Sequence, residues 1–307
     1  MSGGPHRAGF VSIAGRPNAG KSTLLNALVG EKLAITAHQP QTTRTSIQGV
    51  LTLPEAQIVF IDTPGIHNSN TLFNRRMMNT VRGALQDRDL VLFVVDASRP
   101  VAEEDEHAVS AIEKASKALL ALNKIDRVDD KRLLLPLIER YMQLFPFLEA
   151  LPISARTGAG VDELKRILIE HLPEGPALFP DDYLTDQPLR FLAAEIVRER
   201  ILRSARNEVP HAVAVLIDSW EESERLVKIA ATIHVERPGQ KTILIGSQGQ
   251  MLKTIGSEAR QELERMLGRR VFLSLFVKVK PRWREDAAFL GAVDWRSMIG
   301  SEDTATS

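Results

Sequence analysis

The sequence predicts an α/β domain with a doubly wound, mostly parallel sheet, followed by a smaller α+β domain. In the first half, short apolar segments alternate with helical patterns, which is typical of a sheet covered by helices on both faces. After His171 the predicted order of elements changes to α-β-β-α-α-β. The segment 172–180 between the two halves contains three prolines and a glycine, which cannot continue a helix.

The elements of the first domain follow from their apolar patterns. The run 90–95 has no polar alternation, which is typical of a central strand buried on both faces. We expect strands at 10–14, 58–61, 90–95, 118–122 and 151–153, and helices at 22–29, 73–85, 103–114, 131–145 and 161–171.

The second domain is predicted to contain a helix at 188–206, strands at 212–219 and 225–236, a helix-turn-helix around Gly246 and a strand at 271–279. One short helix is expected in the tail, which ends in polar residues. We place the first domain at 1–175, a proline-rich linker at 176–187, the second domain at 188–284 and the tail at 285–307.

The charge distribution, the cysteine content and the apolar stretches of the chain favour some classes of function and exclude others. The chain has 39 basic and 39 acidic residues, but the stretch 225–284 has 13 lysines or arginines against 4 acidic residues, a local net charge of +9 that favours a polyanionic partner. The absence of cysteine excludes disulfides and thiolate metal sites and agrees with a cytoplasmic location. No leader-like segment or long apolar stretch is present, so we expect neither secretion nor membrane spanning.

A phosphate-binding loop lies directly after the first predicted strand. The residues Gly-Arg-Pro-Asn-Ala-Gly-Lys-Ser at 15–22 match the template G-x-x-x-x-G-K-[ST]. Its glycines let backbone N–H groups point at phosphate oxygens, Lys21 adds a charge, and Ser22 can ligate Mg²⁺. The predicted nucleotide-binding residues here are Gly15, Arg16, Pro17, Asn18, Ala19, Gly20, Lys21, Ser22 and Thr23.

A second motif, Asp-Thr-Pro-Gly, follows the predicted strand 58–61. Asp62 can hold Mg²⁺, and the N–H of Gly65 can meet a terminal phosphate. A glutamine after this glycine could orient an attacking water, but Ile66 occupies that position here and cannot do so. His67 is the nearest titratable group, although a loop imidazole more often faces solvent. The predicted nucleotide-binding residues of this motif are Asp62, Thr63, Pro64, Gly65 and Ile66.

The motif Asn-Lys-Ile-Asp selects the base. A carboxylate at Asp126 accepts two N–H groups of guanine that adenine does not offer, and Asn123 would tie this loop to the phosphate loop. The stem of Lys124 would lie on the base, and Ser154-Ala155 could present an N–H to guanine O6. The predicted base-binding residues are Asn123, Lys124, Ile125, Asp126, Ser154 and Ala155.

A threonine in the segment 39–44 can close over Mg²⁺ when the terminal phosphate is present, and we choose Thr43 over Thr42. Ser22, Thr43 and Asp62 are therefore the expected metal ligands, and Thr43, Gly65 and Asn18 the residues expected to act in catalysis. Because these elements occur in the right order along the chain, we expect the domain to bind GTP and GDP with Mg²⁺ and to hydrolyse GTP.

With these motifs the chain resembles the Era family of bacterial GTPases over roughly residues 8–285. The resemblance implies a P-loop GTPase domain followed by a type II KH domain, whose GxxG loop would be Gly246-Ser-Gln-Gly249. The family usually has a basic residue inside this loop, and here both middle residues are uncharged. The expected RNA-binding residues are Gly246, Ser247, Gln248, Gly249, Lys241, Lys253 and Arg260.

By resemblance, the partners would be the 3′ end of small-subunit (16S) ribosomal RNA and the 30S subunit, whose maturation the protein would assist. The resemblance also implies K⁺ near Asn18 and a loose association with the inner face of the cell membrane. We expect a monomer and no DNA partner.

Two alternatives stay open. The second domain could be a protein-interaction or membrane-surface module of a regulatory GTPase. The chain could also be a tRNA-modifying or large-subunit assembly GTPase, but those relatives carry additional domains.

Overall fold

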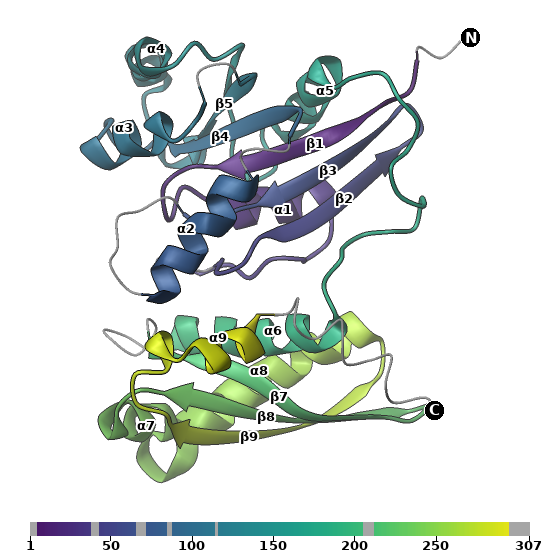
Figure 1. The fold of residues 1–307 in the computed structure, drawn as a ribbon, viewed down its shortest axis with the longest axis vertical. Helices are drawn as coiled ribbons and strands as arrows, with labels where there is room; N and C mark the ends of the chain where they lie inside the picture. Colours follow the sequence, from purple (N-terminus) through teal and green to yellow (C-terminus); the bar gives the residue numbers. More distant parts are fainter. Residues whose placement is uncertain are drawn as a thin grey trace. The chain divides into compact units, whose positions relative to one another are not determined.

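The protein is described by a computed structural model over residues 5–37, 43–65, 72–84, 88–113, 116–204 and 212–294. Its contacts divide the chain into two compact units, and the principal boundary lies between Asp186 and Gln187. Figure 1 shows the elements of each unit. Among the described residues, no helix is both long and apolar enough to cross a bilayer.

The first unit is built on a six-stranded sheet in the order β2-β3-β1-β4-β5-β6. Only the pair β2–β3 is antiparallel, while β1 pairs in parallel with β3 and β4, β4 with β5, and β5 with β6. The strands are β1 (Arg7–Ala14), β2 (Ile47–Leu53), β3 (Ala56–Asp62), β4 (Leu90–Asp96), β5 (Ala118–Asn123) and β6 (Ala150–Pro152).

Helices cover both faces of this sheet. One apolar core joins the sheet to α1 (Lys21–Val29) and α5 (Val161–His171), and a second core lies against α2 (Leu72–Ala84), α3 (Glu103–Ser110) and α4 (Leu134–Leu144). The predicted doubly wound, mostly parallel fold is therefore confirmed.

Three local expectations were wrong. Strand β2 was not predicted at all, since its sequence Ile-Gln-Gly-Val-Leu-Thr-Leu has little regular alternation and carries no motif. The helix expected over 131–145 begins as a short 3₁₀ turn, Lys131–Leu133, because Asp130 caps it by accepting a hydrogen bond from the N–H of Arg132. The helix expected over 103–114 ends earlier, at Ser110. Residue 85, where another helix was expected to end, lies outside the described residues.

The proline-rich segment after α5 is hydrogen-bonded to the sheet of the first unit. The N–H of Ala8 donates to the carbonyl of Pro173, and the N–H of Gly175 donates to the carbonyl of His6. Further on, the N–H of Val50 in β2 donates to the carbonyl of Leu184. The expected linker is thus attached along the sheet, and it descends beside β2 and β3 in Figure 1.

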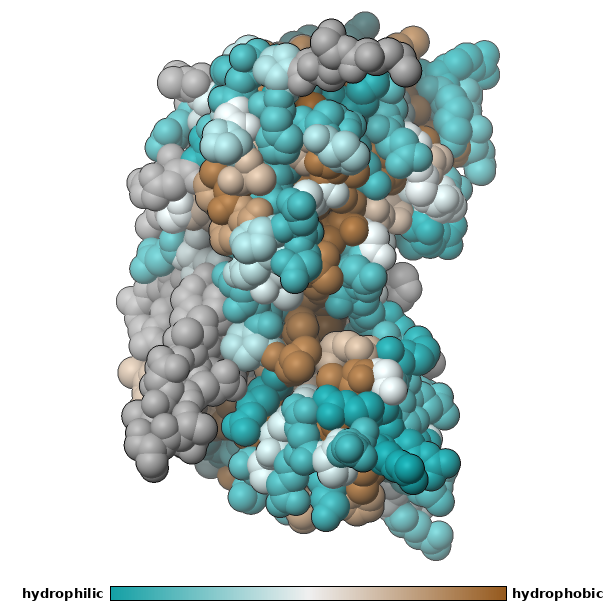
Figure 2. All heavy atoms as spheres, turned by 90° about the vertical axis from the view of Figure 1, so that its right-hand side faces the viewer, coloured by the Kyte–Doolittle hydropathy of each residue, from teal (hydrophilic) through white to brown (hydrophobic). Residues whose placement is uncertain are grey.

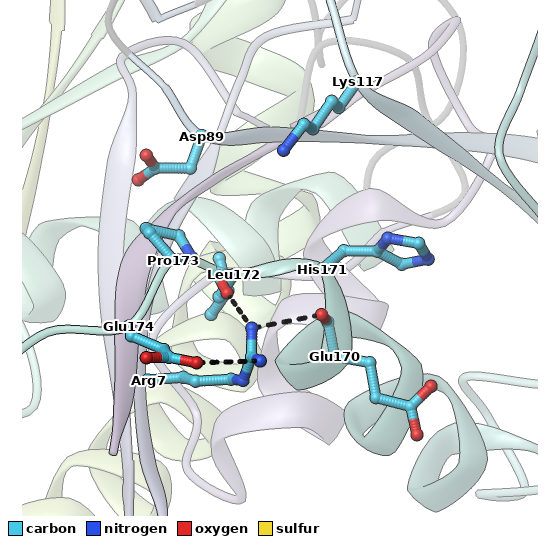
Figure 3. A pocket seen from close by; sticks show the side chains of 8 residues that line it. All are labelled: Arg7, Asp89, Lys117, Glu170, His171, Leu172, Pro173 and Glu174. Atoms are coloured by element: carbon cyan, nitrogen blue, oxygen red, sulfur yellow. Dashed lines mark hydrogen bonds and ion pairs between the residues drawn. The ribbon is translucent and has the colours of Figure 1, made fainter. Parts of the chain in front are cut away.

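A pocket of about 470 Å³ lies at the amino ends of the central strands. Figure 3 shows how Arg7 closes one side of it, with its guanidinium against the carbonyls of Glu170 and Leu172 and the carboxylate of Glu174. Asp89 and Lys117 line the opposite side. Because ligands of open α/β sheets bind at the carboxyl ends of strands, this pocket lies at the wrong edge for the predicted nucleotide.

The second unit contains a three-stranded sheet in the order β7-β8-β9, with β7–β8 antiparallel and β8–β9 parallel. Its strands are β7 (Ala214–Glu222), β8 (Leu226–Val235) and β9 (Arg270–Val279), and its main helices are α6 (Leu189–Ser204), α7 (Pro238–Ile245) and α8 (Gln250–Leu267). The element order is α-β-β-α-α-β, as the sequence predicted for a type II KH domain.

Helices α6 and α8 pack on one face of this small sheet. The opposite face is partly covered by the C-terminal elements, the turn Trp283–Glu285 and α9 (Ala287–Val293). Trp283 is fully buried, and its indole N–H donates to the carbonyl of Ala212 over 2.9 Å. Its ring lies 5.7 Å from that of Phe289, which in turn contacts His234 of β8. The turn and α9 are therefore part of the core of the second unit.

We predict that Trp283→Ala lowers the free energy of unfolding of the second unit by about 3–5 kcal/mol, because it leaves a cavity and an unpaired carbonyl. Chemical denaturation of the full chain measures this loss, and nucleotide affinity serves as the control for an intact first unit. A loss below about 1 kcal/mol would contradict the packing role of this indole.

Candidate functional site

The phosphate-binding loop connects β1 to α1 and depends on two glycines. Gly15 has a φ of 142°, and a Cβ there would lie 2.2 Å from the carbonyl oxygen of Val94. Gly20 has a φ of 101°, and a Cβ there would lie 2.3 Å from the side-chain amide of Asn123. Both positions therefore exclude any other residue, and α1 begins directly after the second glycine.

Lys21 lies inside this loop with its ammonium group buried. Its Nζ donates to the carbonyl oxygens of Gly15 and Arg16, each at 3.0 Å. Burial lowers the pKa of Lys21 to about 8, and the nearby Asp62 carboxylate acts in the opposite direction. A phosphate at this loop would favour the charged form of the amine.

The side chains of Ser22, Thr43 and Asp62 meet beside this lysine. Ser22 Oγ lies 2.8 Å from Thr43 Oγ1, and both hydroxyls donate to Asp62 Oδ2, over 2.8 and 3.0 Å. They come from α1, from the segment before β2 and from the end of β3, respectively. The structure thus brings together all three residues that we expected to ligate the metal.

The second carboxylate oxygen of Asp62, Oδ1, is buried and has no hydrogen-bond partner among the described residues. Burial raises the pKa of Asp62, while Lys21, Ser22 and Thr43 oppose this shift. An unpartnered buried carboxylate oxygen beside two hydroxyls fits a hard cation such as Mg²⁺, which accepts few protein ligands and takes the rest from phosphate and water. Within the described residues, no group of three or more His, Cys, Asp or Glu side chains is placed so that it could hold a metal ion by itself.

The segment after Asp62 lies against the phosphate loop. Thr63 Oγ1 donates to the carbonyl of Ile13 over 2.8 Å, and a Cβ on Gly65 would lie 2.7 Å from Pro17 Cα. Pro64 is buried beside them. Only glycine therefore lets this segment come so close to the loop. Ile66, His67, Thr42 and the residues 39–41 lie outside the described part of the chain.

Asn123 joins three loops at the carboxyl edge of the sheet. Its side-chain Nδ2 donates to the carbonyl of Ala19 over 2.9 Å, and its Oδ1 accepts the N–H groups of Lys124 and Ala155, over 2.8 and 2.9 Å. The N–H of Ile125 donates to the carbonyl of Ile153. The predicted base-binding loops are therefore held to each other and to the phosphate loop.

Asp126 has both carboxylate oxygens paired. Oδ1 accepts from Ser154 Oγ and Oδ2 accepts from Arg156, each over 2.6 Å. The hydrogen bond from Ser154 lowers the pKa of Asp126, with a further contribution from Arg156. The carboxylate that we expect to select the base is thus ionised, as it must be in order to accept two N–H groups.

Sequence reasoning missed three residues that support this site. Asp96, directly after the buried run of β4, accepts from Lys124 Nζ over 2.7 Å. Asp105 of α3 accepts from the guanidinium of Arg16 over 2.8 Å, so that this predicted nucleotide-binding side chain is held by α3. Arg156 follows the predicted Ser-Ala pair. Of these three residues, only Asp96 could have been found from the sequence, because it stands at the end of a strand, where ligands of α/β sheets bind.

The remaining predicted residues of the phosphate loop are more exposed. Asn18 is exposed with a φ of 63°, and its carbonyl accepts from Lys124 Nζ. Thr23 is half-buried in the first turn of α1.

In the second unit, the predicted GxxG loop connects α7 to α8. Gly246 has a φ of 73° and would clash with Met251 if it carried a Cβ, at 2.7 Å. Gly249 has a φ of 77° with open space where a Cβ would be, and Ser247 and Gln248 between them are exposed. This loop therefore presents backbone to solvent at the start of an 18-residue helix.

The expected basic partners of this loop differ in position. Lys253 is exposed in the first turn of α8, and Lys241 is half-buried on α7. Arg260 lies three turns along α8, and its guanidinium donates to both carboxylate oxygens of Glu264 at 2.8 Å. The structure thus keeps Arg260 away from the loop and already paired.

Comparison with protein families identifies both units. Residues 10–124 match the family model "50S ribosome-binding GTPase", and residues 208–284 match the family model "KH domain". Among curated proteins, the chain is 51% identical to GTPase Era of Geobacter metallireducens over 94% of this chain and 98% of the relative. It is 48% identical to GTPase Era of Trichlorobacter lovleyi with the same two coverages.

Solved structures give the same result for the whole chain. Era in complex with MgGDPNP and nucleotides 1506–1542 of 16S ribosomal RNA matches with a TM-score of 0.91 at 41% identity, over 94% of this chain and 99% of that one. A variant of Aquifex aeolicus Era bound to GDP and aluminium fluoride matches with the same TM-score and identity over 94% of this chain and 99% of that one.

We predict that nucleotide binding takes up more protons at pH 8 than at pH 7, because burial lowers the pKa of the free Lys21 to about 8 and the bound lysine stays charged. Titration calorimetry with Mg²⁺ and GDP, in buffers of different ionisation enthalpy, measures this uptake. Equal uptake at the two pH values would show that Lys21 does not titrate in the free protein.

Proposed function

This chain belongs to the Era family of GTPases, and we propose that it is a GTP-hydrolysing switch that binds the 3′ end of 16S ribosomal RNA and assists its processing and 30S subunit assembly. A relative at 41% identity has been solved with a Mg²⁺–GTP analogue and this part of the RNA. The KH match and the local charge of +9 in the second unit support an RNA partner.

The observation that best supports this proposed switch is that the side chains of Ser22, Thr43 and Asp62 lie together beside Lys21. Two hydroxyls, a partly unpaired carboxylate and a buried amine form a set that suits a metal-bound polyphosphate. Thr43 comes from a segment between α1 and β2, so its place in this set can depend on the terminal phosphate.

In this proposal Mg²⁺, held by Ser22, Thr43 and Asp62, neutralises charge on the β- and γ-phosphate oxygens. Lys21 supplies a charge over the same oxygens, and the N–H groups of the loop 15–20 orient them. Gly65, packed on Pro17, would offer its own N–H to the terminal phosphate. These groups stabilise the transferring phosphoryl group by fixed geometry.

We also propose that K⁺ binds near Asn18, whose side chain is exposed in the phosphate loop. A monovalent cation there would add positive charge at the phosphates without an arginine finger.

Guanine selection rests on Asp126. We predict that Asp126→Asn weakens GDP binding by about 10²-fold and strengthens binding of xanthosine diphosphate, because the carboxamide donates where the carboxylate accepts. Competition binding with both nucleotides measures the change. Asp129→Asn, the same substitution three residues away on an exposed side chain, is the matched control. Unchanged guanine preference in the Asp126 variant would place the base selector elsewhere.

RNA binding rests on the GxxG loop. We predict that Gly249→Asp lowers affinity for single-stranded RNA of the 16S 3′-end sequence by at least about tenfold, because a carboxylate would face the phosphates, and leaves GTP turnover unchanged. Filter binding at two salt concentrations measures the loss.

Gly268→Asp is the matched control for this experiment. Gly268 ends α8 with a φ of 63° and, like Gly249, has open space at the Cβ position. Equal losses in the two variants would refute a specific role of the loop. Wild-type protein that binds anionic lipid vesicles but not this RNA would instead support a role at the membrane surface.

A further inference from the structure

The segment that leads to the second unit is hydrogen-bonded to the first unit. We call residues 172–186 the strap. Its beginning is bonded to β1 through Ala8 and the preceding His6, and its end is bonded to β2. Figure 2 shows the molecule from the side on which the strap runs in Figure 1, and brown apolar groups lie between hydrophilic ones there.

Gln57 of β3 holds the middle of the strap. Its side chain is fully buried, and its Oε1 accepts the N–H groups of Leu178 and Phe179, over 2.7 and 2.9 Å. Its Nε2 donates to the carbonyl of Phe179 over 2.9 Å and to Thr52 Oγ1 over 3.0 Å. All four hydrogen-bonding positions of the amide are used, three of them on the strap.

The end of the strap is bonded to the outer edge of β2. The N–H of Val50 donates to the carbonyl of Leu184 over 2.8 Å, and Thr185 Oγ1 donates to the carbonyl of Gln48 over 2.7 Å. Between these bonds and Gln57, the rings of Phe179 and Tyr183 stack with centroids 4.7 Å apart. The strap thus acts as an extra partner for an edge strand whose polar groups would otherwise face solvent.

Strands β2 and β3 connect the two segments that surround the terminal phosphate. Strand β2 begins at Ile47, shortly after Thr43, and β3 ends at Asp62, shortly before Gly65. A displacement of Thr43 therefore acts directly on the strand to which the last residues of the strap are bonded. The second unit begins immediately after the strap, at Gln187.

We propose that the strap transmits the nucleotide state of the first unit to the second, with Gln57 and Thr185 as its positioning residues. When Thr43 moves with the terminal phosphate, β2 shifts, and the strap carries that shift to Gln187. This inference rests on the proposed function, since it requires RNA affinity to depend on the nucleotide. It attributes the dependence of RNA affinity on the nucleotide to the hydrogen-bonded strap, and not to a flexible hinge.

The experiment compares RNA dissociation constants of the full-length protein loaded with GDP and with a non-hydrolysable GTP analogue. In wild-type protein we expect a ratio of about 5- to 150-fold between the two states. In the double variant Gln57→Leu/Thr185→Val, which removes every side-chain hydrogen bond that these two residues make to strap or β2 backbone, we expect a ratio below about 2. Nucleotide affinity and intrinsic GTP turnover should stay within about twofold.

Thr52→Val is the matched control for Thr185→Val, because each removes one hydroxyl bonded in this region but only Thr185 joins the strap to β2. The control should keep the wild-type ratio. Hydrogen exchange at the amide of Val50 should accelerate in the double variant and not in the control, since its acceptor is Leu184. Should the Gln57 substitution prevent folding, Thr185→Val against Thr52→Val makes the same comparison.

A wild-type ratio in the double variant would overturn the proposal, and so would unchanged exchange at Val50, because the strap would then not depend on these side chains. A ratio near one in the wild-type protein itself would instead refute the nucleotide-dependent switch of the proposed function. The two failures are therefore distinguished by which protein shows them.

Discussion

The burial of two opposite charges side by side, Lys21 and Asp62, is the constraint on which the site depends. Burial lowers the pKa of Lys21 and raises that of Asp62, so each group is held in surroundings that oppose its charge. Two backbone carbonyls and two hydroxyls offset part of this cost. Asp62 Oδ1 stays without a hydrogen-bond partner among the described residues, and a hard cation bound with an anionic ligand would satisfy it.

The loops around these two groups are held in place by hydrogen bonds to one another and to α3. Asn123 connects the phosphate loop to both base-binding loops, and Arg16 connects it to α3 through Asp105. Asp105 also caps α3 by accepting a hydrogen bond from the N–H of Ala102. The hydroxyl of Tyr141 lies next to Asp105, and burial raises its pKa. The site residues are therefore positioned by α1 and α3 and by the carboxyl ends of β1, β3, β4, β5 and β6.

The strap extends this rigidity toward the second unit. Its prolines prevent a helix, and its backbone instead pairs with the buried amide of Gln57 and with the free edge of β2. A segment whose composition suggests a flexible linker is thereby ordered by the sheet that it crosses.

The sequence by itself determined the fold class, the family and the residues of the nucleotide motifs. These features are local: the phosphate loop, the Asp-Thr-Pro-Gly motif and the Asn-Lys-Ile-Asp motif are each a run of fewer than ten residues at the end of a strand, and parallel strands bring such runs to one edge. The same reasoning found the α-β-β-α-α-β order of the second unit and its GxxG loop between two helices.

Only the tertiary structure decided which side chains meet across long separations. The bond of Arg16 to Asp105 joins residues 89 apart, and the clamp of Gln57 on Phe179 joins residues 122 apart. Side-chain hydrogen bonds of this kind leave no periodicity or spacing in the chain, because their geometry exists only once the sheet has brought distant strands together.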